Sequence, residues 1–330
     1  MNALELTKEL INIESISGNE LAVVNFLADY LDGIGFHVEL QEAEAQRPNI
    51  YAKRGEPDVM LSTHTDTVPP YVELREDDEY IYGRGACDTK GLMAAMLKAA
   101  EGLMAENVSD FGMLLVVGEE NGSVGAKVAN HIENRSRYLI NGEPTESKLA
   151  LGSKGAMRAI VRAQGRAAHS AYPHMGESAI EKLLDILNDV RQAELPTNDV
   201  LGATTMNIGL ISGGVAANVI PPAAEAELMF RVVTDTRSLK QILETAVGKR
   251  AAIDYGFECE PVFMEKIAGY ETAVVSFTTD IPALTNWGKP LLYGPGSILD
   301  AHTAGEKIVK NDVLAAVDIY QAMVKQLKQQ

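Results

Sequence analysis

The sequence predicts an α/β protein whose mixed, mostly parallel sheet is flanked by helices and whose chain is interrupted by an inserted ferredoxin-like α+β domain. Three observations lead to this prediction. Short apolar runs of strand type alternate with helical segments in the first half of the chain: VMLSTH, MLLVVG and YLINGE. Each run leads directly into ionisable residues, at the position where open α/β sheets bind ligands. After about residue 155, the order of strands and helices changes to one that suits a small sandwich domain.

Composition restricts the classes of function that the chain can have. Of 330 residues, 46% are hydrophobic and 23% are charged, which is typical of a folded protein with room for one large or two ordinary domains. The net charge of −17 would repel phosphate backbones and anionic membranes, so neither is an expected partner. No apolar run approaches the roughly 20 residues of a membrane span. With only two cysteines, Cys87 and Cys259, and no secretory pattern at the N-terminus, the sequence predicts a cytoplasmic protein.

The first 154 residues are expected to form most of the main domain. A helix is predicted in the segment SISGNELAVVNFLADYLDGIGF, in which Ser17 and Glu20 have the spacing of a capping box and Gly33 offers a stop. A second helix, rich in Ala, Met and Leu, is predicted over residues 89–105, between the first two apolar strands. A strand, a helix and a strand in this order indicate a parallel pair of strands.

Residues 155–265 are predicted to form the inserted domain. Its expected elements are strand-like MRAIVRAQG, a helix at 176–192, strands at 203–212 and 225–234, a helix at 238–249 and a strand at 257–264. That order is the βαββαβ pattern of a ferredoxin-like sandwich. Residues 266–330 return to strand-like LLYG and end in a helix at 311–328, so we expect them to complete the first domain together with residues 1–154.

Side chains that suit metal ions follow the predicted strands and recur near the end of the chain. They are His64 and Asp66 in LSTHTDTVPP, Asp88 in YGRGACDTKG, Glu119 and Glu120 in VVGEENG, Glu143 in NGEPT, and His302 in GPGSILDAHTAGE. Imidazole and carboxylate ligands suit zinc, and also cobalt or manganese. Five of these residues could be metal ligands, because two ions about 3.5–4 Å apart need one bridging carboxylate and further ligands for each ion.

Each of these signals also has an ordinary structural explanation. Asp88 directly precedes a predicted helix and could be its N-cap. The HTD segment could be a surface pair, and adjacent glutamates such as Glu119 and Glu120 usually lie on a solvated face. Both glutamates can serve one site only where the chain turns, and the following Asn121-Gly122 supplies a turn. The joint placement of these residues at strand ends favours a site.

The motifs, taken in order, carry a resemblance to a known family. The chain contains SxxGNE, HTDTVP, YGRGACDTKG, GEENGSVGA, NGEPT, GRAAHSAYPHMGESAI, NVIPP and GPGS…AHTAGE. Over nearly its whole length it resembles the metallopeptidase family that includes acetylornithine deacetylase, succinyl-diaminopimelate desuccinylase, aminoacylases and glutamate carboxypeptidases. The resemblance implies a catalytic domain of the zinc-peptidase type, an inserted lid or dimerisation domain, and a homodimer.

The resemblance also implies two divalent metal ions, zinc or alternatively cobalt, and a ligand set for each. Asp88 resembles the bridging carboxylate that the two ions share. His64 and Glu143 resemble the ligands of one ion, and Glu120 and His302 those of the other.

Three further residues match positions that assist the reaction in the family. Asp66 resembles the residue that fixes the imidazole of His64. Glu119 resembles the general base and acid, which takes a proton from the attacking water and delivers it to the departing amine. His169, in GRAAHSAYP, resembles a histidine that stabilises the tetrahedral intermediate and that reaches the site across a dimer interface in relatives; without that context it would be a loop histidine.

Substrate recognition is implied for two segments of the chain. Arg231, in ELMFRVV, resembles an arginine that binds a substrate carboxylate through its forked donors, although an exposed strand charge explains it equally well. Asn218 in GGVAANVIPP matches a further binding segment. Gly296 and Ser297 lie in a glycine-rich loop whose backbone amides could approach a ligand closely.

The expected activity is hydrolysis of the amide bond of a small N-acylamino acid. N-acetylornithine, N-acetylcitrulline and N-acetyl-lysine are the substrates that the resemblance favours, with a role in amino-acid biosynthesis, such as that of arginine. A dipeptidase or carboxypeptidase of the same family is the alternative, because both reactions cleave an amide beside a carboxylate. A binding protein that has lost catalysis is less compatible with the complete ligand set and Glu119, and a two-metal phosphatase would leave His169 without a purpose.

Overall fold

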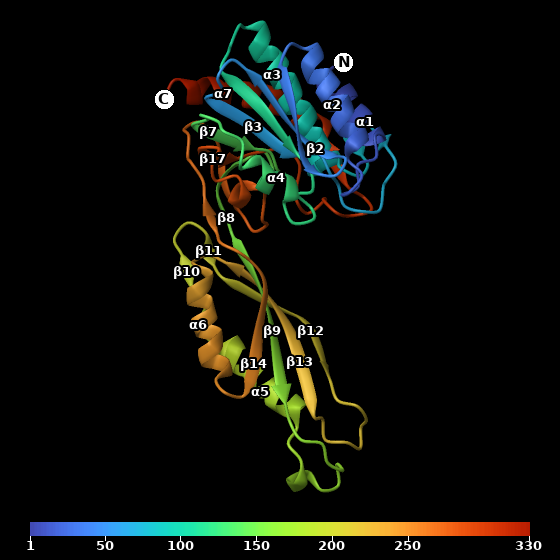
Figure 1. The fold of residues 1–330 in the computed structure, drawn as a ribbon, viewed down its shortest axis with the longest axis vertical. Coiled ribbons are helices and arrows are strands. Elements are labelled where there is room, and N and C mark those ends of the chain that lie inside the picture. Colours follow the sequence, from blue (N-terminus) through green and yellow to red (C-terminus); the bar gives the residue numbers. More distant parts are fainter. The chain divides into compact units, whose positions relative to one another are not determined.

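A computed structural model describes residues 1–330 and divides into two compact units. Unit 1 comprises Met1–Leu151, Met264–Ala273 and Thr279–Gln330, and unit 2 comprises Gly152–Phe263 and Val274–Thr278. Both chain ends belong to unit 1 (Figure 1). The segments of unit 2 therefore interrupt the chain of unit 1 twice.

A six-stranded sheet forms the centre of unit 1. In spatial order its strands are β1 (His37–Glu44), β2 (Arg47–Arg54), β6 (Phe111–Val116), β3 (Val59–His64), β7 (Tyr138–Asn141) and β17 (Lys289–Leu292). The last four strands are parallel to one another, whereas β2 is antiparallel to both of its neighbours. Every residue of β3, β6 and β7 is buried, which explains their continuous apolar sequences. The predicted mixed, mostly parallel sheet is confirmed.

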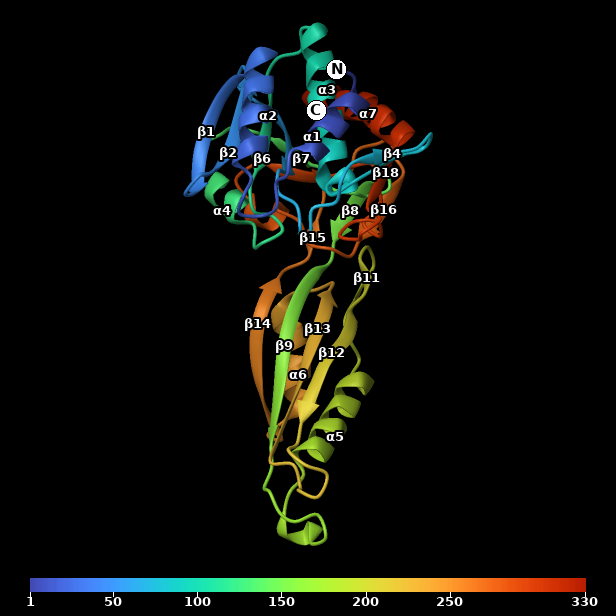
Figure 2. The ribbon, with the colours of Figure 1, turned by 90° about the vertical axis from the view of Figure 1, so that its right-hand side faces the viewer.

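Alternate residues of these strands divide between two cores on opposite faces of the sheet. Leu61 and Met113 point to the larger core, which is covered by the helices α1 (Ala3–Asn12), α2 (Leu21–Gly33), α3 (Gly91–Ala105) and α7 (Lys310–Lys328). Met60 and Leu114 point to the smaller core, which contains Trp287 and residues of the short helix α4 (Val124–Ala129). Figure 2 shows the helices of the larger core beside the sheet. Helix α3 has ten buried residues, which accounts for its Ala, Met and Leu content.

The start of α2 differs from the predicted capping box. The helix begins at Leu21, and the side chain of Glu20 makes no hydrogen bond to its N-terminus. Instead, the carboxylate of Glu20 is fully buried and accepts a hydrogen bond from Arg47 Nε at 2.8 Å. The hydroxyl of Ser17 donates to Asp66 Oδ2 at 2.6 Å. Both side chains are used in contacts between distant segments, which the local spacing does not reveal.

Short elements connect the larger ones. Unit 1 also contains the small antiparallel sheet of β4 (Arg75–Glu76), β5 (Tyr80–Tyr82) and β18 (Lys307–Val309), the wide turn η1 (Ala86–Lys90) and the turn η3 (Ile281–Ala283). The chain passes between the units near β8 (Leu149–Ser153), β15 (Val262–Phe263) and β16 (Thr272–Val275).

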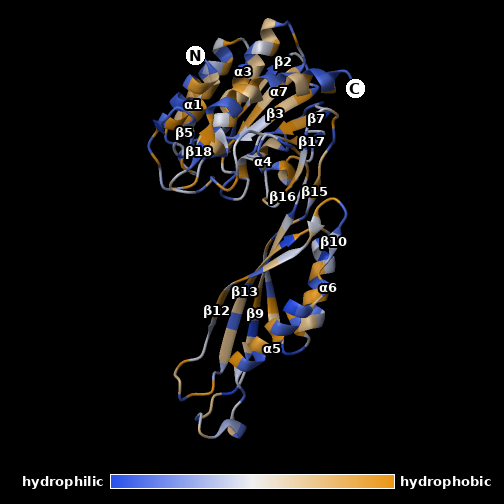
Figure 3. Ribbon diagram, turned by 180° about the vertical axis from the view of Figure 1, so that it is seen from behind, coloured by the Kyte–Doolittle hydropathy of each residue, from blue (hydrophilic) through white to orange (hydrophobic).

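Unit 2 is a four-stranded antiparallel sheet with two helices on one face. In spatial order its strands are β12 (Thr205–Gly213), β13 (Ala223–Val232), β9 (Gly155–Gln164) and β14 (Ala251–Cys259), and its helices are α5 (Ala179–Gln192) and α6 (Thr236–Val247). The apolar side chains of the helices and sheet form one core. Figure 3 shows both hydrophobic and hydrophilic residues along α5 and α6, as expected of helices that pack on a sheet through one face. The chain order of these six elements is the predicted βαββαβ.

Two boundaries in unit 2 differ from the prediction. Helix α5 begins at Ala179 because the hydroxyl of Ser178 accepts a hydrogen bond from the Glu181 N–H at 3.2 Å. The last strand begins at Ala251 rather than at residue 257, because Ile253 and its alternate neighbours already pack against the core. The remaining short elements are η2 (Pro173–Met175), β10 (Thr197–Asn198) and β11 (Gly202–Ala203). No helix of the chain combines the length and hydrophobicity that a membrane span requires.

Candidate metal centre

Three neighbouring parallel strands end at one edge of the unit 1 sheet and carry acidic and imidazole side chains there. His64 is the last residue of β3, Glu119 and Glu120 follow β6, and Glu143 follows β7. Because these strands are adjacent and parallel, their carboxyl ends lie side by side. Side chains that are far apart in the sequence are thereby gathered at one edge.

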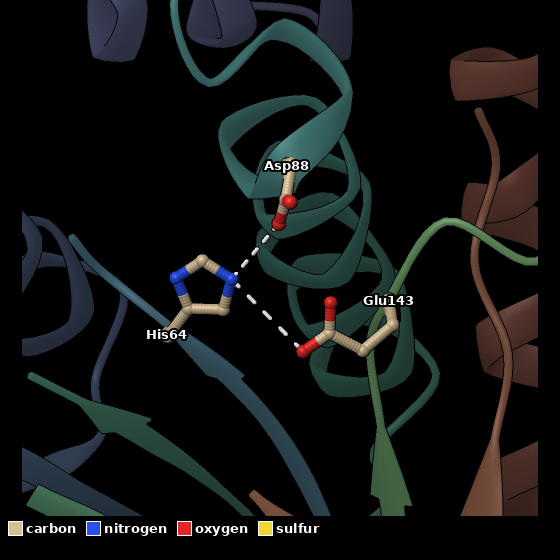
Figure 4. A group of neighbouring side chains, drawn as sticks. All are labelled: His64, Asp88 and Glu143. Atoms are coloured by element: carbon tan, nitrogen blue, oxygen red, sulfur yellow. Dashed lines mark hydrogen bonds and ion pairs between the residues drawn. The ribbon is translucent and has the colours of Figure 1, made fainter. Parts of the chain in front are cut away.

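The first set of possible ligands, which we call the inner group, consists of His64, Asp88 and Glu143. Figure 4 shows His64 Nε2 facing both carboxylates. Nε2 lies 3.0 Å from Asp88 Oδ1 and 3.9 Å from Glu143 Oε1. The three residues are 1%, 5% and 4% exposed. One donor atom from each lies within 4.8 Å of the others, so the inner group is a compact, buried set.

The second set, which we call the outer group, consists of Asp88, Glu120 and His302. His302 Nε2 lies 2.8 Å from Glu120 Oε1 and 3.3 Å from Asp88 Oδ2. The side chain of His302 is 48% exposed, whereas that of Glu120 is 8% exposed. His302 has a left-handed backbone with φ of 62°, in a turn of the last segment of unit 1. The outer group is therefore open to solvent on the side of His302.

Asp88 belongs to both groups through different atoms. Its Oδ1 faces His64 and its Oδ2 faces His302, which is the arrangement of a carboxylate that bridges two ions. Asp88 does not cap a helix: α3 begins at Gly91, and Asp88 has non-helical angles of φ −126° and ψ 82° within the turn η1. The N-cap explanation of this residue is therefore not observed.

Asp66 supports both His64 and the turn that carries the two glutamates. His64 Nδ1 lies 2.9 Å from the backbone carbonyl of Asp66, so Nδ1 carries the proton and the Nε2 lone pair faces the inner group. The Asp66 carboxylate accepts hydrogen bonds from the N–H groups of Glu119 at 3.0 Å and Glu120 at 3.3 Å, and from the hydroxyl of Ser17. The Asp66 carbonyl and the Asp66 carboxylate, whose Oδ1 lies 3.4 Å from His64 Nδ1, both face the imidazole. The carboxylate also holds the glutamate turn.

The electrostatics of the site favour bound cations. Burial raises the pKa of Glu143 and that of Glu119 well above their ordinary values, and nearby carboxylates raise them further. Hydrogen bonds to Asp88 and Glu120 raise the pKa of His302 to about 10. The charged forms of these acids repel one another in a buried space, and a divalent cation would remove that repulsion.

The donor atoms fit a pair of divalent ions. Oε1 of Glu143 is buried without a hydrogen-bond partner and faces His64, as an unused ligand atom would. Each group offers one imidazole nitrogen and two carboxylates, which is a donor set for zinc or cobalt rather than for calcium. The predicted ligands His64, Asp88, Glu120, Glu143 and His302 are thus brought together, and their role as ligands remains a proposal.

The predicted binding loop with Gly296 and Ser297 packs against the segment that follows Glu143. Ser297 forms an isolated β-bridge with Thr145, and the N–H of Glu146 donates to the Gly296 carbonyl at 2.8 Å. Gly296 has φ of 89°, and a Cβ atom there would lie 2.8 Å from Cys87 Cβ. Glycine is required at this position because the loop approaches the turn η1 closely.

The other predicted binding residues lie in unit 2, at opposite ends of its sheet. His169 and Asn218 are on adjacent exposed loops, where the N–H of Ser170 donates to the Asn218 carbonyl at 3.0 Å. Arg231 lies on β13 and pairs with Ala156, near the start of β9, whereas His169 follows the other end of that strand. Unit 2 therefore brings His169 and Asn218 together and keeps Arg231 apart from them.

Three buried side chains that the sequence did not single out support the loops of the centre. Asn49 accepts a hydrogen bond from the Val117 N–H at 3.1 Å and donates to the Gly125 carbonyl at 2.9 Å, so it joins the two ends of the glutamate turn. Arg84 and Glu306 form a buried pair beside η1. Arg84 and Glu306 occur inside quoted motifs, YGRGACD and AHTAGE, whereas no sequence signal marked Asn49.

Comparisons with known proteins agree with this arrangement. Residues 151–254 match the family model described as a peptidase dimerisation domain. A peptidase M20 domain-containing protein of Schizosaccharomyces pombe is 39% identical, over 98% of this chain and 84% of that protein. A probable carboxypeptidase of Aspergillus clavatus is 34% identical, over 98% of this chain and 88% of that protein.

A solved structure has the same fold. The crystal structure of a tripeptidase from Staphylococcus aureus matches with a TM-score of 0.82 and 22% sequence identity, over 100% of this chain and 98% of that one. The match spans both units, so the combination of the two folds in one chain is shared with that protein.

Proposed function

The chain belongs to the M20 peptidase family, and on that premise we propose that it hydrolyses the peptide bond of short peptides with the aid of two divalent metal ions. Enzymes of this family are metal-dependent hydrolases that act on amide bonds. The sequence motifs pointed first to removal of an acetyl group from an amino acid. The similar proteins are named as a carboxypeptidase and a tripeptidase, and these names favour the peptidase alternative.

The observation that carries the proposal is the sharing of Asp88 between two ligand groups. Its two oxygens face His64 and His302, and Glu143 and Glu120 complete the inner and outer groups. In this proposal the inner group would hold one ion and the outer group the other. Zinc is the first choice and cobalt the second, because both accept imidazole and carboxylate donors. When bound, such ions lower the pKa of a water molecule and stabilise negative charge on a carbonyl oxygen.

Glu119 is the proton carrier in this proposal. It belongs to neither ligand group, its backbone N–H donates to Asp66 at 3.0 Å, and its carboxylate is near enough to His64 and Asp88 for their charges to affect its pKa. Its carboxylate takes a proton from the attacking water and later gives it to the departing amine. In the metal-free protein, burial raises the pKa of Glu119 above its ordinary value.

The unit 2 residues are proposed to bind the substrate in a homodimer. Arg231 would hold the terminal carboxylate of the peptide through its forked donors, and His169 would donate to the oxygen of the tetrahedral intermediate. The register places Arg231 opposite Ala156, so the length of β9 up to Gln164, about 26 Å at 3.3 Å per residue, separates it from the loop of His169. If both contact one substrate, they come from two subunits, which agrees with the dimerisation-domain match.

The remaining binding residues and the compartment complete the proposal. Asn218, Gly296 and Ser297 would supply further polar contacts to the peptide. Cys87 and Cys259 are both free in the structure, which agrees with a reducing compartment, and we propose the cytoplasm.

A substrate panel tests the proposed function. The purified protein, supplied with zinc or with cobalt, would be assayed on dipeptides, on tripeptides and on N-acetylornithine, N-acetylcitrulline and N-acetyl-lysine. We expect the best short peptide to exceed the best acetylamino acid by at least about tenfold in kcat/KM. If an acetylamino acid has a higher kcat/KM than every peptide, the preference for peptides is wrong and deacetylation becomes the favoured activity. Absence of bound metal together with absence of any amide cleavage would overturn the whole proposal.

The oligomeric state tests the dimer separately. Light scattering on the purified protein is expected to give twice the mass of one chain. If the protein is a monomer under the conditions of the peptide assay and still cleaves peptides, His169 of a second subunit takes no part in the reaction.

A further inference from the structure

A buried ion pair lies directly beneath the turn that presents Asp88. Arg84 Nη1 and Glu306 Oε2 are 2.5 Å apart, and the two residues are 2% and 0% exposed. Neither belongs to the ligand groups, and neither carries a role in the function proposed above. A fully buried pair needs an explanation, because removing two charges from water costs free energy that their attraction does not always return.

Glu306 fixes the backbone of Asp88. Its Oε1 accepts hydrogen bonds from two successive N–H groups, those of Cys87 at 3.3 Å and of Asp88 at 3.2 Å. Asp88 and the following Thr89 depart from helical angles in η1, so no helical hydrogen bond determines the orientation of Asp88. Its two carboxylate oxygens face different histidines, and a small rotation about the backbone would break one of these contacts. The Glu306 carboxylate supplies the fixed point that prevents this rotation.

Arg84 joins the same turn to two neighbouring segments. Its Nε donates to the carbonyl of Pro70 at 3.1 Å, in the loop that follows β3. Its Nη1 is 3.4 Å from the carbonyl of Thr303, the residue after His302. One guanidinium therefore contacts the loop after the inner histidine, the turn of the outer histidine and the carboxylate that holds Asp88.

We infer that Glu306, oriented by Arg84, is a positioning residue that sets Asp88 to bridge the inner and outer groups. This inference rests on the proposed two-metal function. The pair acts through Asp88 and touches neither the ions nor the substrate. Without the acceptor at position 306, Asp88 would keep its carboxylate but lose its alignment. Both ions would then be held less tightly, because both ligand groups share Asp88.

The competing explanation is that the Arg84–Glu306 pair only stabilises the fold. Two double variants distinguish this explanation from the proposed positioning of Asp88. Arg84→Met with Glu306→Gln removes both charges but keeps a side-chain oxygen that can accept from the two N–H groups. Arg84→Met with Glu306→Met removes both charges and the acceptor, with a side chain of similar length. Both variants are neutral at the buried site, where replacing an ion pair by apolar groups of similar volume is often tolerated.

The measurement is metal affinity, by competition with a chromophoric chelator, together with urea unfolding of the metal-free proteins. We expect R84M/E306M to bind both ions about 10- to 100-fold more weakly than R84M/E306Q, with similar unfolding midpoints for the two. We further expect the affinity of R84M/E306Q to lie between those of the wild type and R84M/E306M, because the amide keeps the acceptor but loses the guanidinium that orients it.

The outcomes are distinguishable from failure of the proposed function. Equal metal affinity in the two variants, while the wild-type chain binds two ions, would overturn this inference alone. A wild-type chain that binds no metal would overturn the proposed function and this inference with it. Should R84M/E306M fail to fold, R84M/E306T, whose hydroxyl is too short to reach both N–H groups, replaces it under the same expectations.

Discussion

The two histidines of the metal centre occupy corresponding positions in the inner and outer groups, but their surroundings differ. The side chain of His64 is 1% exposed, and its Nδ1 is held by the Asp66 carbonyl at 2.9 Å. The side chain of His302 is 48% exposed, and only its Nε2 makes contacts with other side chains. His64 ends a central strand, whereas His302 lies in a turn. We therefore expect the inner group to be set in place by the fold before any ion binds, and the outer group would gain part of its order from an ion.

The largest effect is expected where the two groups meet. Asp88→Asn keeps the shape of the side chain but removes the charge that both ions share. We expect loss of both ions and a fall in kcat/KM beyond about 10⁴-fold, because the chemistry loses its main electrostatic support. Metal analysis and peptide hydrolysis check this, with Asp185→Asn, an exposed carboxylate of α5, as the control. A variant that retains both ions would show that the groups are independent.

A smaller loss is expected at the carboxylate that lies outside both groups. Glu119→Gln should retain two ions while kcat falls about 10²- to 10⁴-fold, because the amide cannot accept the proton of the attacking water. KM should change little, since Glu119 takes no part in holding the substrate in this proposal. Metal content and steady-state kinetics are measured on the same preparation, and undiminished kcat would remove Glu119 from the mechanism.

The inner and outer groups can be compared directly by removing each histidine. His302→Ala should lower the affinity for the ion of the outer group by about 10- to 100-fold. The unfolding free energy of the metal-free protein should hardly change, because the side chain of His302 is half exposed. His64→Ala should lower the affinity for the ion of the inner group. It should also lower the unfolding free energy, because it opens a cavity in a fully buried site. Titration of the wild-type chain with a chelator should release two ions in separate steps. Release in one step with equal effects of both substitutions would contradict the distinction.

The last prediction concerns the stability of the metal-free protein rather than activity or metal binding, and it involves a buried carboxylate near the inner group. Asp280 is 1% exposed, neither of its oxygens has a hydrogen-bond partner, and burial raises its pKa to about 7. Because the pKa in the folded protein exceeds the ordinary value of 3.8, the folded state binds more protons between these values. The stability that this group contributes is therefore complete below pH 3.8 and is lost as the pH rises to about 7.

Asp280→Asn removes this dependence. In the metal-free protein at pH 8 we expect the variant to be more stable than the wild type, by up to about 4 kcal/mol, and the difference to vanish below about pH 4. Urea unfolding at several pH values measures it, again with Asp185→Asn as the control. Equal pH profiles for the variant and the wild type would mean that burial does not raise the pKa of Asp280.

Much of the candidate site could be predicted from the chain because its possible ligands are marked by local signals. Strand-like runs that end in His64, Glu120 and Glu143 indicated one edge of a parallel sheet, and the structure has that edge. Ser17 and Glu20 were predicted to cap a helix because their spacing fits a capping box. They make contacts with Asp66 and Arg47 instead, and no periodicity along the chain carries information about such partners.

By itself the sequence determined the order of the elements, the family and the residues that offer metal-binding chemistry, because strand alternation, helix periodicity and motif letters are local properties. The contacts by which Asp88 turns its two oxygens to different histidines and Glu306 holds its backbone arise only in the folded chain. Likewise, only in the folded chain do Arg231 and His169 stand at opposite ends of one sheet. These relations depend on the register of strands and the angles of turns, which result from the packing of the whole chain rather than from the preferences of neighbouring residues.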